Sequence, residues 1–400
     1  MHIKPILTSL TLFYSITIPA TAVADSLDIM AKSIVENNGA YQLELAKAEA
    51  DILDKKIANN LEDPEISVSH VWGAEGIGNK FGIEVSQSFD WPGVYSARSE
   101  AVAKNSLALK HLAEANRIEL ILQAKCLLID LSNAAMKRNA YRNALKVIDS
   151  LSVIVAKDVE RKEVSILDGN KLKIERISIS RKYNDAVNVF NDAYVQLIEL
   201  NGGKARPDIV EYADREFTLP SLRSLDDYLL ESANANPEMS YRAQLNKLNL
   251  ANEKVAKLES LPGFSVGLRH ELEQGDRFNG FSVSMSLPFL SSRGKKKAAK
   301  AQTVASELET DRISVSTRAR ITGDYNSAKQ LMQEISEYKL IIEAEDNLRL
   351  LNRAFEARHI SVLDYISDLV YFTDATCEYL DLNHAYRLKL ASLERYSLLK

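Results

Sequence analysis

The stretch Phe281-Ser282-Val283-Ser284-Met285-Ser286-Leu287 decides the fold, because apolar and serine side chains alternate through it without a break. A two-residue period is the pattern of a β-strand, whose successive side chains point to opposite faces. The run just before it behaves in the same way, with Phe264, Val266 and Leu268 at every second position. We therefore predict a β-hairpin over about residues 264–289, with one apolar and one serine-rich face.

A less regular copy of this hairpin lies earlier in the chain, over about residues 65–91. Val85-Ser86-Gln87-Ser88 returns as Val283-Ser284-Met285-Ser286, and Ser26-Leu27-Asp28 returns as Ser224-Leu225-Asp226, both 198 residues later. A constant offset indicates an internal repeat. We predict a first repeat unit at residues 25–200, a linker at 201–223 and a second unit at 224–400.

Long helices complete each predicted unit. Residues 94–158 and 295–357 contain no proline, and at 1.5 Å per residue such helices reach roughly 95 Å. Apolar residues follow heptad spacing on more than one face, which is typical of a helix with two neighbours. Further helices are predicted at residues 27–60 and 225–260, before the hairpins. The fold class is mainly α with a small antiparallel β part.

Composition excludes several classes of protein. The 400 residues include only 15 Gly and 9 Pro, too few turn formers for an all-β sandwich, a collagen repeat or a disordered chain. A net charge of -5 without a basic patch argues against nucleic acid as a partner. Cys126 and Cys377 are too few for a disulfide scaffold or a four-ligand zinc site.

The N-terminus has the features of a signal peptide. Lys4 precedes an apolar run over residues 6–18, and Ala22-Val23-Ala24 has the small-x-small form of a cleavage site. We expect residues 1–24 to be removed and the chain to leave the cytoplasm.

The amphipathic strands fit two environments, a half-buried soluble sheet or the wall of a transmembrane barrel. The signal peptide and the aromatic residues at the strand ends favour the barrel. The predicted lipid-facing side chains are Ile83, Val85, Phe89, Phe264, Val266, Leu268, Phe281, Val283, Met285 and Leu287. The predicted lumen-facing side chains are Ser67, Ser86, Ser265, Ser282, Ser284 and Ser286.

Counting strands then predicts oligomerisation. Lipid leaves no partner for an unpaired strand edge, so a barrel must close. One chain supplies four predicted strands, whereas single-chain barrels begin at about eight. Two copies would make a barrel filled by side chains, and three copies would leave room for a channel.

The arrangement of these elements resembles the TolC-like outer-membrane efflux proteins over essentially the whole mature chain. The pieces that carry the resemblance are Asn236-Pro237-Glu238, Leu261-Pro262-Gly263-Phe264 and two Ser-x-Leu-Asp turns. The resemblance implies a homotrimer with a 12-stranded transmembrane β-barrel, four strands per chain, continued by a long periplasmic α-helical barrel. It places the chain in the outer membrane of a Gram-negative bacterium.

The same resemblance implies a function. The chain would be the passive exit duct of a tripartite efflux system, working with a periplasmic adaptor (membrane fusion) protein and an inner-membrane efflux pump. The stretch Ser86 to Gly93 is most similar to the subgroup that serves heavy-metal cation efflux. A duct for type I protein secretion and a periplasmic coiled-coil adaptor or scaffold are the alternatives.

In that family the turns at the far end of the helical tunnel dock the adaptor and border the closed entrance. The matching residues here are Ser165, Leu167 and Asp168 in one turn and Ser361, Leu363 and Asp364 in the other. Asp364 and Asp368 are the expected periplasmic gate, although the family's second aspartate falls on Ser367. A capped helix start explains the same pattern, and the two roles are compatible.

No residue pattern indicates catalysis, a bound cofactor or a metal site. The histidines are scattered, and neither a Ser-His-Asp nor a Cys-His set stands in a suitable context. The basic run Arg293-Gly294-Lys295-Lys296-Lys297 follows the second hairpin. It fits either contact with anionic lipid head groups or simple solvation of a helix start.

Overall fold

The computed structural model describes residues 20–75, 78–213, 219–288, 290, 292–344 and 347–398. Most of the predicted signal peptide, residues 1–19, lies outside this part. The chain divides into two compact units. Unit 1 comprises Met1–Gly39, Ile118–Ala233 and Arg320–Lys400, and unit 2 comprises Ala40–Arg117 and Asn234–Ala319. Two long helices, α3 (Pro92–Glu160) and α8 (Lys295–Ala344), contribute to both units.

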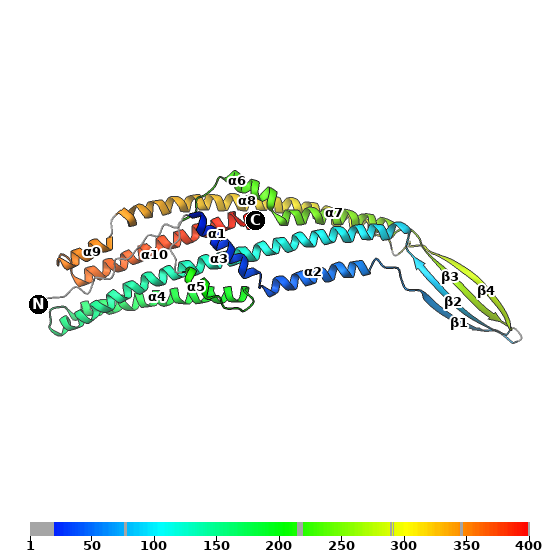
Figure 1. Ribbon diagram of the computed structural model, residues 1–400, viewed down its shortest axis with the longest axis horizontal. Helices are drawn as coiled ribbons and strands as arrows, with labels where there is room; N and C mark the ends of the chain where they lie inside the picture. The colour runs from blue at the N-terminus through cyan, green and yellow to red at the C-terminus, as the bar shows by residue number, and fades with distance from the viewer. Residues whose placement is uncertain are drawn as a thin grey trace. The chain divides into compact units, whose positions relative to one another are not determined.

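Unit 2 contains one antiparallel four-stranded sheet, in the order β1-β2-β3-β4 (Figure 1). The strands are β1 (Glu65–Trp72), β2 (Asn79–Phe89), β3 (Gly263–Glu273) and β4 (Asp276–Ser286). Val85 pairs with Ile66 on one side and Leu268 on the other, and Leu268 pairs with Phe281. Paired residues share a face, so this register gathers the apolar positions of all four strands on one side of the sheet.

The two hairpins differ in their turns. Gln274 and Gly275 alone join β3 to β4, with φ angles of 51° and 97°, the left-handed conformation that two-residue hairpins require. The β1–β2 connection is longer. Glu65 pairs with Ser86, whereas Gly263, its counterpart 198 residues later, pairs with Ser286 rather than Ser284. This shift is by two residues, and each side chain therefore keeps its face.

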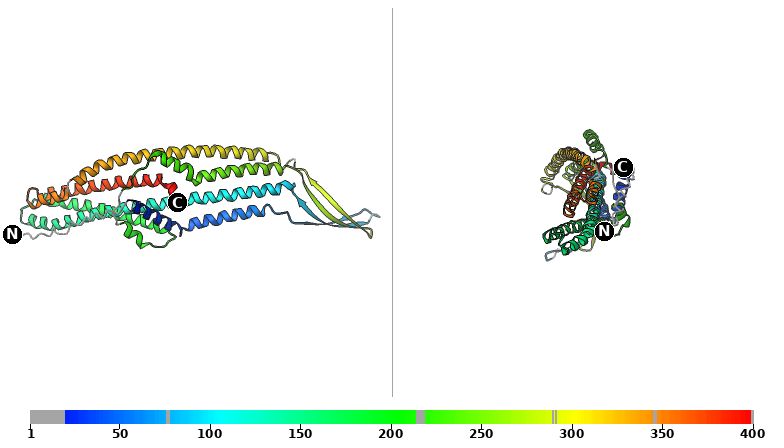
Figure 2. Two further views of the ribbon diagram at one scale, coloured as in Figure 1. Left: turned by 45° about the horizontal axis from the view of Figure 1, so that its top comes forward. Right: turned by 90° about the vertical axis from the view of Figure 1, so that its left-hand side faces the viewer.

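The helices of unit 2 are α2 (Gly39–Ile57), α7 (Pro237–Leu258) and the adjoining parts of α3 and α8. A small apolar cluster of Ala101, Leu248 and Ala251 joins α3 to α7. Polar contacts add to it: Asn105 donates to Asp51 at 2.8 Å, and Asn246 donates to Thr310 at 3.2 Å. Figure 1 and the left view of Figure 2 show these helices side by side, with the sheet at their ends.

The further helices of unit 1 are α1 (Ala20–Val35), α4 (Ile166–Leu200), α5 (Pro207–Ala213), α6 (Leu225–Ala235), α9 (Asn347–Glu356) and α10 (Val362–Leu393). Two apolar clusters hold them together. Cluster A joins α1, α3, α4, α5 and α10, and Ile34, Leu128, Leu197 and Ile209 are among its fully buried members. Cluster B consists of Tyr141, Ala144, Ile148, Leu151, Val155, Leu172, Ile179, Ala186, Leu351, Tyr365, Ile366, Leu369 and Cys377.

Charged and polar pairs run alongside these clusters between α3 and α10. His384 lies 2.6 Å from Asp130, and Lys137 lies 2.7 Å from Asp381. Lys125 is 4% exposed and is paired with Asp28 at 2.7 Å. A buried charge is tolerated only when it is paired in this way.

The structure corrects two helix predictions, and two further segments are described next to them. The predicted helix at 27–60 breaks between α1 and α2, where Asn38 donates to the carbonyl of Leu200 at 3.0 Å. The predicted helix at 225–260 breaks at Asn236, whose side chain caps α7 by accepting from the N–H of Glu238 at 2.9 Å. The predicted linker at 201–223 contains α5. The predicted helix at 295–357 is assigned as α8 and α9, with residues 345–346 outside the description.

Candidate functional site

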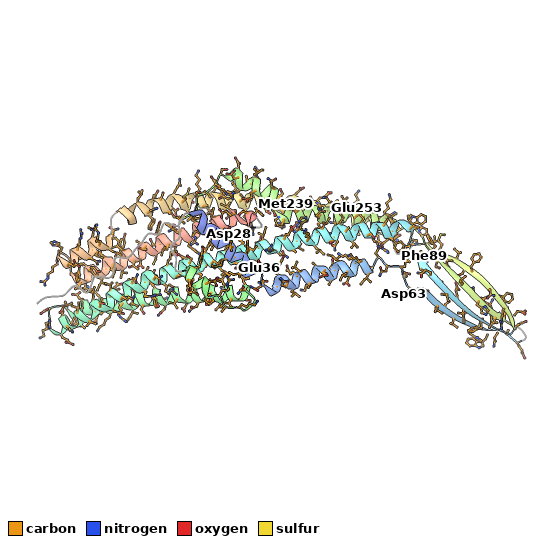
Figure 3. The ribbon with its side chains drawn as sticks, viewed as in Figure 1. Asp28, Glu36, Asp63, Phe89, Met239 and Glu253 are labelled. Atoms are coloured by element: carbon orange, nitrogen blue, oxygen red, sulfur yellow. The ribbon has the colours of Figure 1, made fainter. Side chains whose placement is uncertain are left out.

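The apolar face of the sheet is exposed. Phe281 is 79% exposed, Leu268 73% and Val283 67%. Nine of the ten predicted lipid-facing residues lie on this face, and Leu287 lies just beyond β4. Phe89 lies at the end of β2 that leads into α3 (Figure 3). Nothing in the described part of the chain covers this surface, which is unusual for so many large apolar side chains.

The opposite face is polar and has two different halves. All six predicted lumen-facing serines lie on it, mostly toward the strand ends that adjoin the helices. Toward the hairpin tips it carries charges: Lys80 lies 3.0 Å from Glu271, and Arg269 lies 2.6 Å from Glu271. These ion pairs were not predicted from the sequence, although Arg269, Glu271 and Glu273 stand at every second position of one strand.

Glycines on the polar face make room for these side chains. A Cβ on Gly267 would lie 2.6 Å from Ser282 Oγ and 2.8 Å from Glu84 Oε1, and these two groups hydrogen-bond to each other. A Cβ on Gly82 would lie 2.8 Å from Ser69 Oγ. Neither position accepts a side chain without displacing the polar groups beside it.

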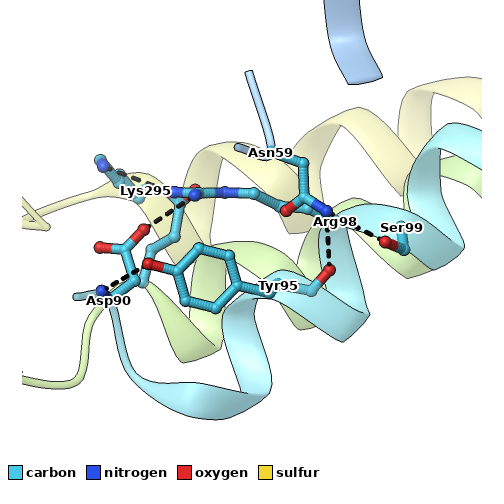
Figure 4. Close-up of polar contacts among 7 residues, drawn as sticks. Asn59, Asp90, Tyr95, Arg98, Ser99 and Lys295 are labelled. Carbon is cyan, nitrogen blue, oxygen red and sulfur yellow. Dashed lines mark hydrogen bonds and ion pairs between the residues drawn. The ribbon is translucent and has the colours of Figure 1, made fainter. Parts of the chain in front are cut away.

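A polar network joins all four places where strands meet helices in unit 2 (Figure 4). Arg98 of α3 donates to Asp90 at 2.8 Å and to Glu259 at 2.8 and 3.1 Å. Lys295, at the start of α8, lies 3.4 Å from Glu259. Asn59, between α2 and β1, donates to the carbonyl of Tyr95 at 3.1 Å. We call this set, with Ser99, the junction network.

Two details show how tightly the junction network is held. The Tyr95 hydroxyl accepts a hydrogen bond from the N–H of Asp90 at 2.9 Å. Partial burial of Arg98 opposes its charge, but Glu259 and Asp90 outweigh this effect and raise its pKa.

A pocket of about 560 Å³ opens beside Arg98, lined by Tyr95, Ser88, Ser265, Ser284 and Ser286 among others. The serine half of the polar face therefore ends at a charged boundary.

The two Ser-x-Leu-Asp turns lie in unit 1 and repeat the same backbone hydrogen bonds. In the first turn, the N–H of Glu163 donates to the carbonyl of Asp158 at 2.8 Å, and Lys162 has a φ of 61°. In the second, the N–H of His359 donates to the carbonyl of Ala354 at 2.9 Å, and Arg358 has a φ of 57°. Both α3 and α9 thus end in a left-handed residue.

A serine caps the helix that follows each turn. Ser165 accepts from the N–H of Asp168 at 3.1 Å, and Ser361 accepts from the N–H of Asp364 at 3.1 Å. Only the second turn has a full capping box, in which Asp364 accepts in return from the N–H of Ser361 at 3.3 Å. Asp168 is bound instead by Lys171 at 3.3 Å, and hydrogen bonds from Ser165 and then Lys171 lower its pKa.

The leucines of the two turns have different surroundings. Leu167 is 66% exposed, and its neighbour Ile166 is 73% exposed. Leu363 instead packs against cluster B. Asp364 and Asp368 are both exposed, one helical turn apart on α10. The first turn therefore presents apolar side chains, and the second presents carboxylates.

Across the described residues, no group of three or more His, Cys, Asp or Glu side chains is placed to hold a metal ion. No helix within the same ranges combines the length and apolarity needed to span a membrane.

Comparison with known proteins identifies the fold. No protein-family profile and no curated protein sequence matches the chain. Among solved structures, CusC is similar at a TM-score of 0.71 and 16% identity, covering 93% of this chain and 92% of CusC. The Campylobacter jejuni outer membrane channel CmeC is similar at a TM-score of 0.71 and 16% identity. The match covers 93% of this chain and 85% of CmeC. The Neisseria gonorrhoeae outer membrane channel MtrE is similar at a TM-score of 0.71 and 16% identity. The match covers 92% of this chain and 88% of MtrE. The chain has the TolC-like fold, as the sequence predicts.

Proposed function

We propose that this chain is the outer-membrane exit duct of a tripartite efflux system. Three copies would pool their strands into a 12-stranded transmembrane barrel, and their helices would continue it as a periplasmic tunnel. An inner-membrane pump and a periplasmic adaptor would deliver the cargo, and the duct would conduct it passively to the exterior. The TolC-like fold over more than nine tenths of the chain supports this proposal.

The observation that carries the proposal is the two-faced sheet. One face exposes Phe281, Leu268 and Val283, and the other carries serines and paired charges. A soluble sheet would bury its apolar face against another layer of the protein. A lipid-facing wall around a wet interior is the environment in which both faces are satisfied.

The sheet's edges support the trimer. Within the described residues, β1 and β4 each have a strand neighbour on one side only. In lipid the other side must find a partner, because each unpaired backbone group costs several kcal/mol. Strands from further copies supply that partner. Four strands from each of three chains give the smallest assembly with an open channel.

We infer that an internal duplication produced this architecture. Two hairpins of similar length form the sheet, and two turns repeat the same cap and left-handed residue 196 residues apart, at Lys162 and Arg358. Three duplicated chains would place six quasi-equivalent units around one axis.

We propose different roles for the two turns at the periplasmic end of the tunnel. We propose that Ile166 and Leu167 provide an apolar contact for the adaptor, with Ser165 and Asp168 fixing the turn. Asp364 and Asp368 are proposed to line the entrance, because both are exposed on one side of α10. Three copies would gather six carboxylates, which favours cations at a narrow opening.

Cargo selection is assigned to the pump. CusC, CmeC and MtrE share the same 16% identity with this chain, so similarity favours none of them as a guide to cargo. The serine-lined face offers hydroxyl groups to any polar solute. Heavy-metal cations, the cargo suggested by residues 86–93, remain one candidate among several.

The test compares two neighbouring residues on opposite faces of β4. A lysine on the lipid face costs about 2–4 kcal/mol near the bilayer centre, so Val283→Lys should strongly reduce the trimer in the outer-membrane fraction. Ser284→Lys, on the polar face, should leave a heat-modifiable, detergent-requiring trimer. Recovery of the wild-type chain as a water-soluble periplasmic monomer would overturn the proposal, as would equal tolerance of the two lysines.

A further inference from the structure

The basic run that follows β4 is not explained by the contacts of the chain. Arg293, Lys295, Lys296 and Lys297 are all exposed. Lys295 belongs to the junction network through Glu259, at 3.4 Å. The other three side chains form no ion pair with the described residues. Three uncompensated cations therefore stand together in a protein whose net charge is -5.

Helix stability does not account for these cations. Lys295, Lys296 and Lys297 are the first three residues of α8, whose first turn contains no acidic residue. The positive end of the helix dipole disfavours cations there. Solvation of a helix start is therefore a poor explanation for the run.

Exposed apolar side chains lie directly beside the cations. Leu290 is 86% exposed and Leu287 51%. The N–H of Arg293 donates to the carbonyl of Leu290 at 3.2 Å, so a tight turn keeps the apolar and basic residues together. Trp91, 42% exposed, packs edge-to-face on Phe264 with ring centroids 6.4 Å apart. Both aromatic residues lie where strands meet helices, at the level of the junction network.

We propose that this surface binds the anionic head groups of the bilayer leaflet nearest the helices. The surface consists of Leu287, Leu290 and Trp91 together with Arg293, Lys296 and Lys297. Apolar and aromatic residues followed by cations match the order of acyl chains, interface and phosphate in a leaflet. The basic residues follow β4 and the exposed Leu287 and Leu290 directly along the chain, which favours a lipid surface over an acidic protein partner. The inference rests on the proposed function, because it requires that apolar face to lie in a bilayer.

Charge arithmetic sets the expected effect. Each basic residue close to an anionic membrane surface favours association by about fivefold. The attraction acts within a Debye length of about 10 Å at 0.1 M salt and weakens as salt increases. Removing three such charges should therefore abolish a measurable preference for anionic lipid.

The experiment uses the two tryptophans as local probes. The only Trp residues are Trp72 and Trp91, so Trp72→Phe leaves Trp91, between β2 and α3 at the same end of the sheet, as the single reporter. The full chain is reconstituted in vesicles of phosphatidylcholine and phosphatidylglycerol, with bromine quenchers on one lipid or the other. At equal mole fractions of the two brominated lipids, we expect phosphatidylglycerol to quench Trp91 about fivefold more effectively. This is the preference that one basic residue near the surface would produce.

Two variants make the test specific. Arg293→Gln, Lys296→Gln and Lys297→Gln together should remove the preference. The matched control changes Lys47, Lys110 and Lys247, exposed lysines of α2, α3 and α7, and should retain it. Equal quenching by both lipids in the parent protein, or a preference unchanged in the triple variant, overturns the inference alone. Quenching by neither lipid would instead show that the chain is outside the bilayer, and the proposed function would fail with it.

Discussion

The two Ser-x-Leu-Asp turns share a backbone but differ in what their side chains do. Both have a left-handed residue, a serine cap and an aspartate in the first turn of the next helix. Leu167 nevertheless faces solvent, whereas Leu363 packs against cluster B. Capping chemistry fixes the shape of a turn, and the apolar position next to it decides whether that turn is buried or presented.

The largest expected difference concerns the leucines. Leu363→Ala removes packing from the partly buried turn and should lower the free energy of unfolding by about 2 kcal/mol. Leu167→Ala removes only exposed surface and should change it by less than about 0.5 kcal/mol. Denaturant unfolding followed by circular dichroism measures both. Equal losses would mean that the two turns have the same surroundings after all.

Loss of the serine cap should lower the free energy of unfolding more in the second turn than in the first, by a smaller margin than the leucines. Ser361→Ala breaks a reciprocal capping box and should cost about 1–2 kcal/mol, toward the upper part of the range for caps. Ser165→Ala loses a single hydrogen bond and should cost about 0.5–1 kcal/mol. Hydrogen exchange at the amides of Asp168 and Asp364 reports each cap directly. A costlier loss at Ser165 would contradict the difference in capping.

The aspartates of the two turns should differ in their effect on the ion selectivity of the channel. If the second turn borders the entrance, Asp364→Ala should lower the cation preference by roughly twofold in planar bilayers. Asp168→Ala is the matched control and should leave the reversal potential unchanged. Unaltered selectivity in the Asp364 variant would remove this residue from the gate.

The smallest expected effect is a pH dependence at the first turn. Hydrogen bonds from Ser165 and then Lys171 hold the folded-state pKa of Asp168 below its ordinary value, so its ionised form stabilises the turn at higher pH. This contribution is lost as the pH falls through the lowered pKa. Asp168→Asn should therefore flatten the acid limb of the stability curve slightly. A carboxyl titration by NMR in which Asp168 has an ordinary or raised pKa would contradict the assignment.

The sequence predicts local features of this fold well. Alternation in residues 281–287 locates β4 and its faces, because the side-chain period of a strand is a local property. His70 and Gln87 interrupt the apolar face that the alternation of β1 and β2 otherwise produces. The helix break before Gly39 has a local signal in Asn37-Asn38-Gly39, which competes with the helix-forming residues on either side. Asn236-Pro237 is likewise a local start signal, because Asn caps α7 and Pro fits its first turn.

Polar contacts between residues far apart in the chain cannot be predicted from local sequence patterns. Arg98 meets Glu259 across 161 residues, and the pairing depends on where β2 and β3 align. The two-residue difference in hairpin register also has no local signal, since a shift by two preserves the faces. Whether a capped leucine is buried depends on neighbouring helices, so Leu167 and Leu363 looked alike in the sequence.

The open outer edges of β1 and β4 have a practical consequence for handling the protein. A strand with unused backbone donors and acceptors beside exposed Ile66 or Phe281 is a template for uncontrolled aggregation. Chains made without lipid or detergent should therefore precipitate as β-rich material before they assemble. Producing this protein in usable form means supplying a micelle or bilayer from the moment the strands form.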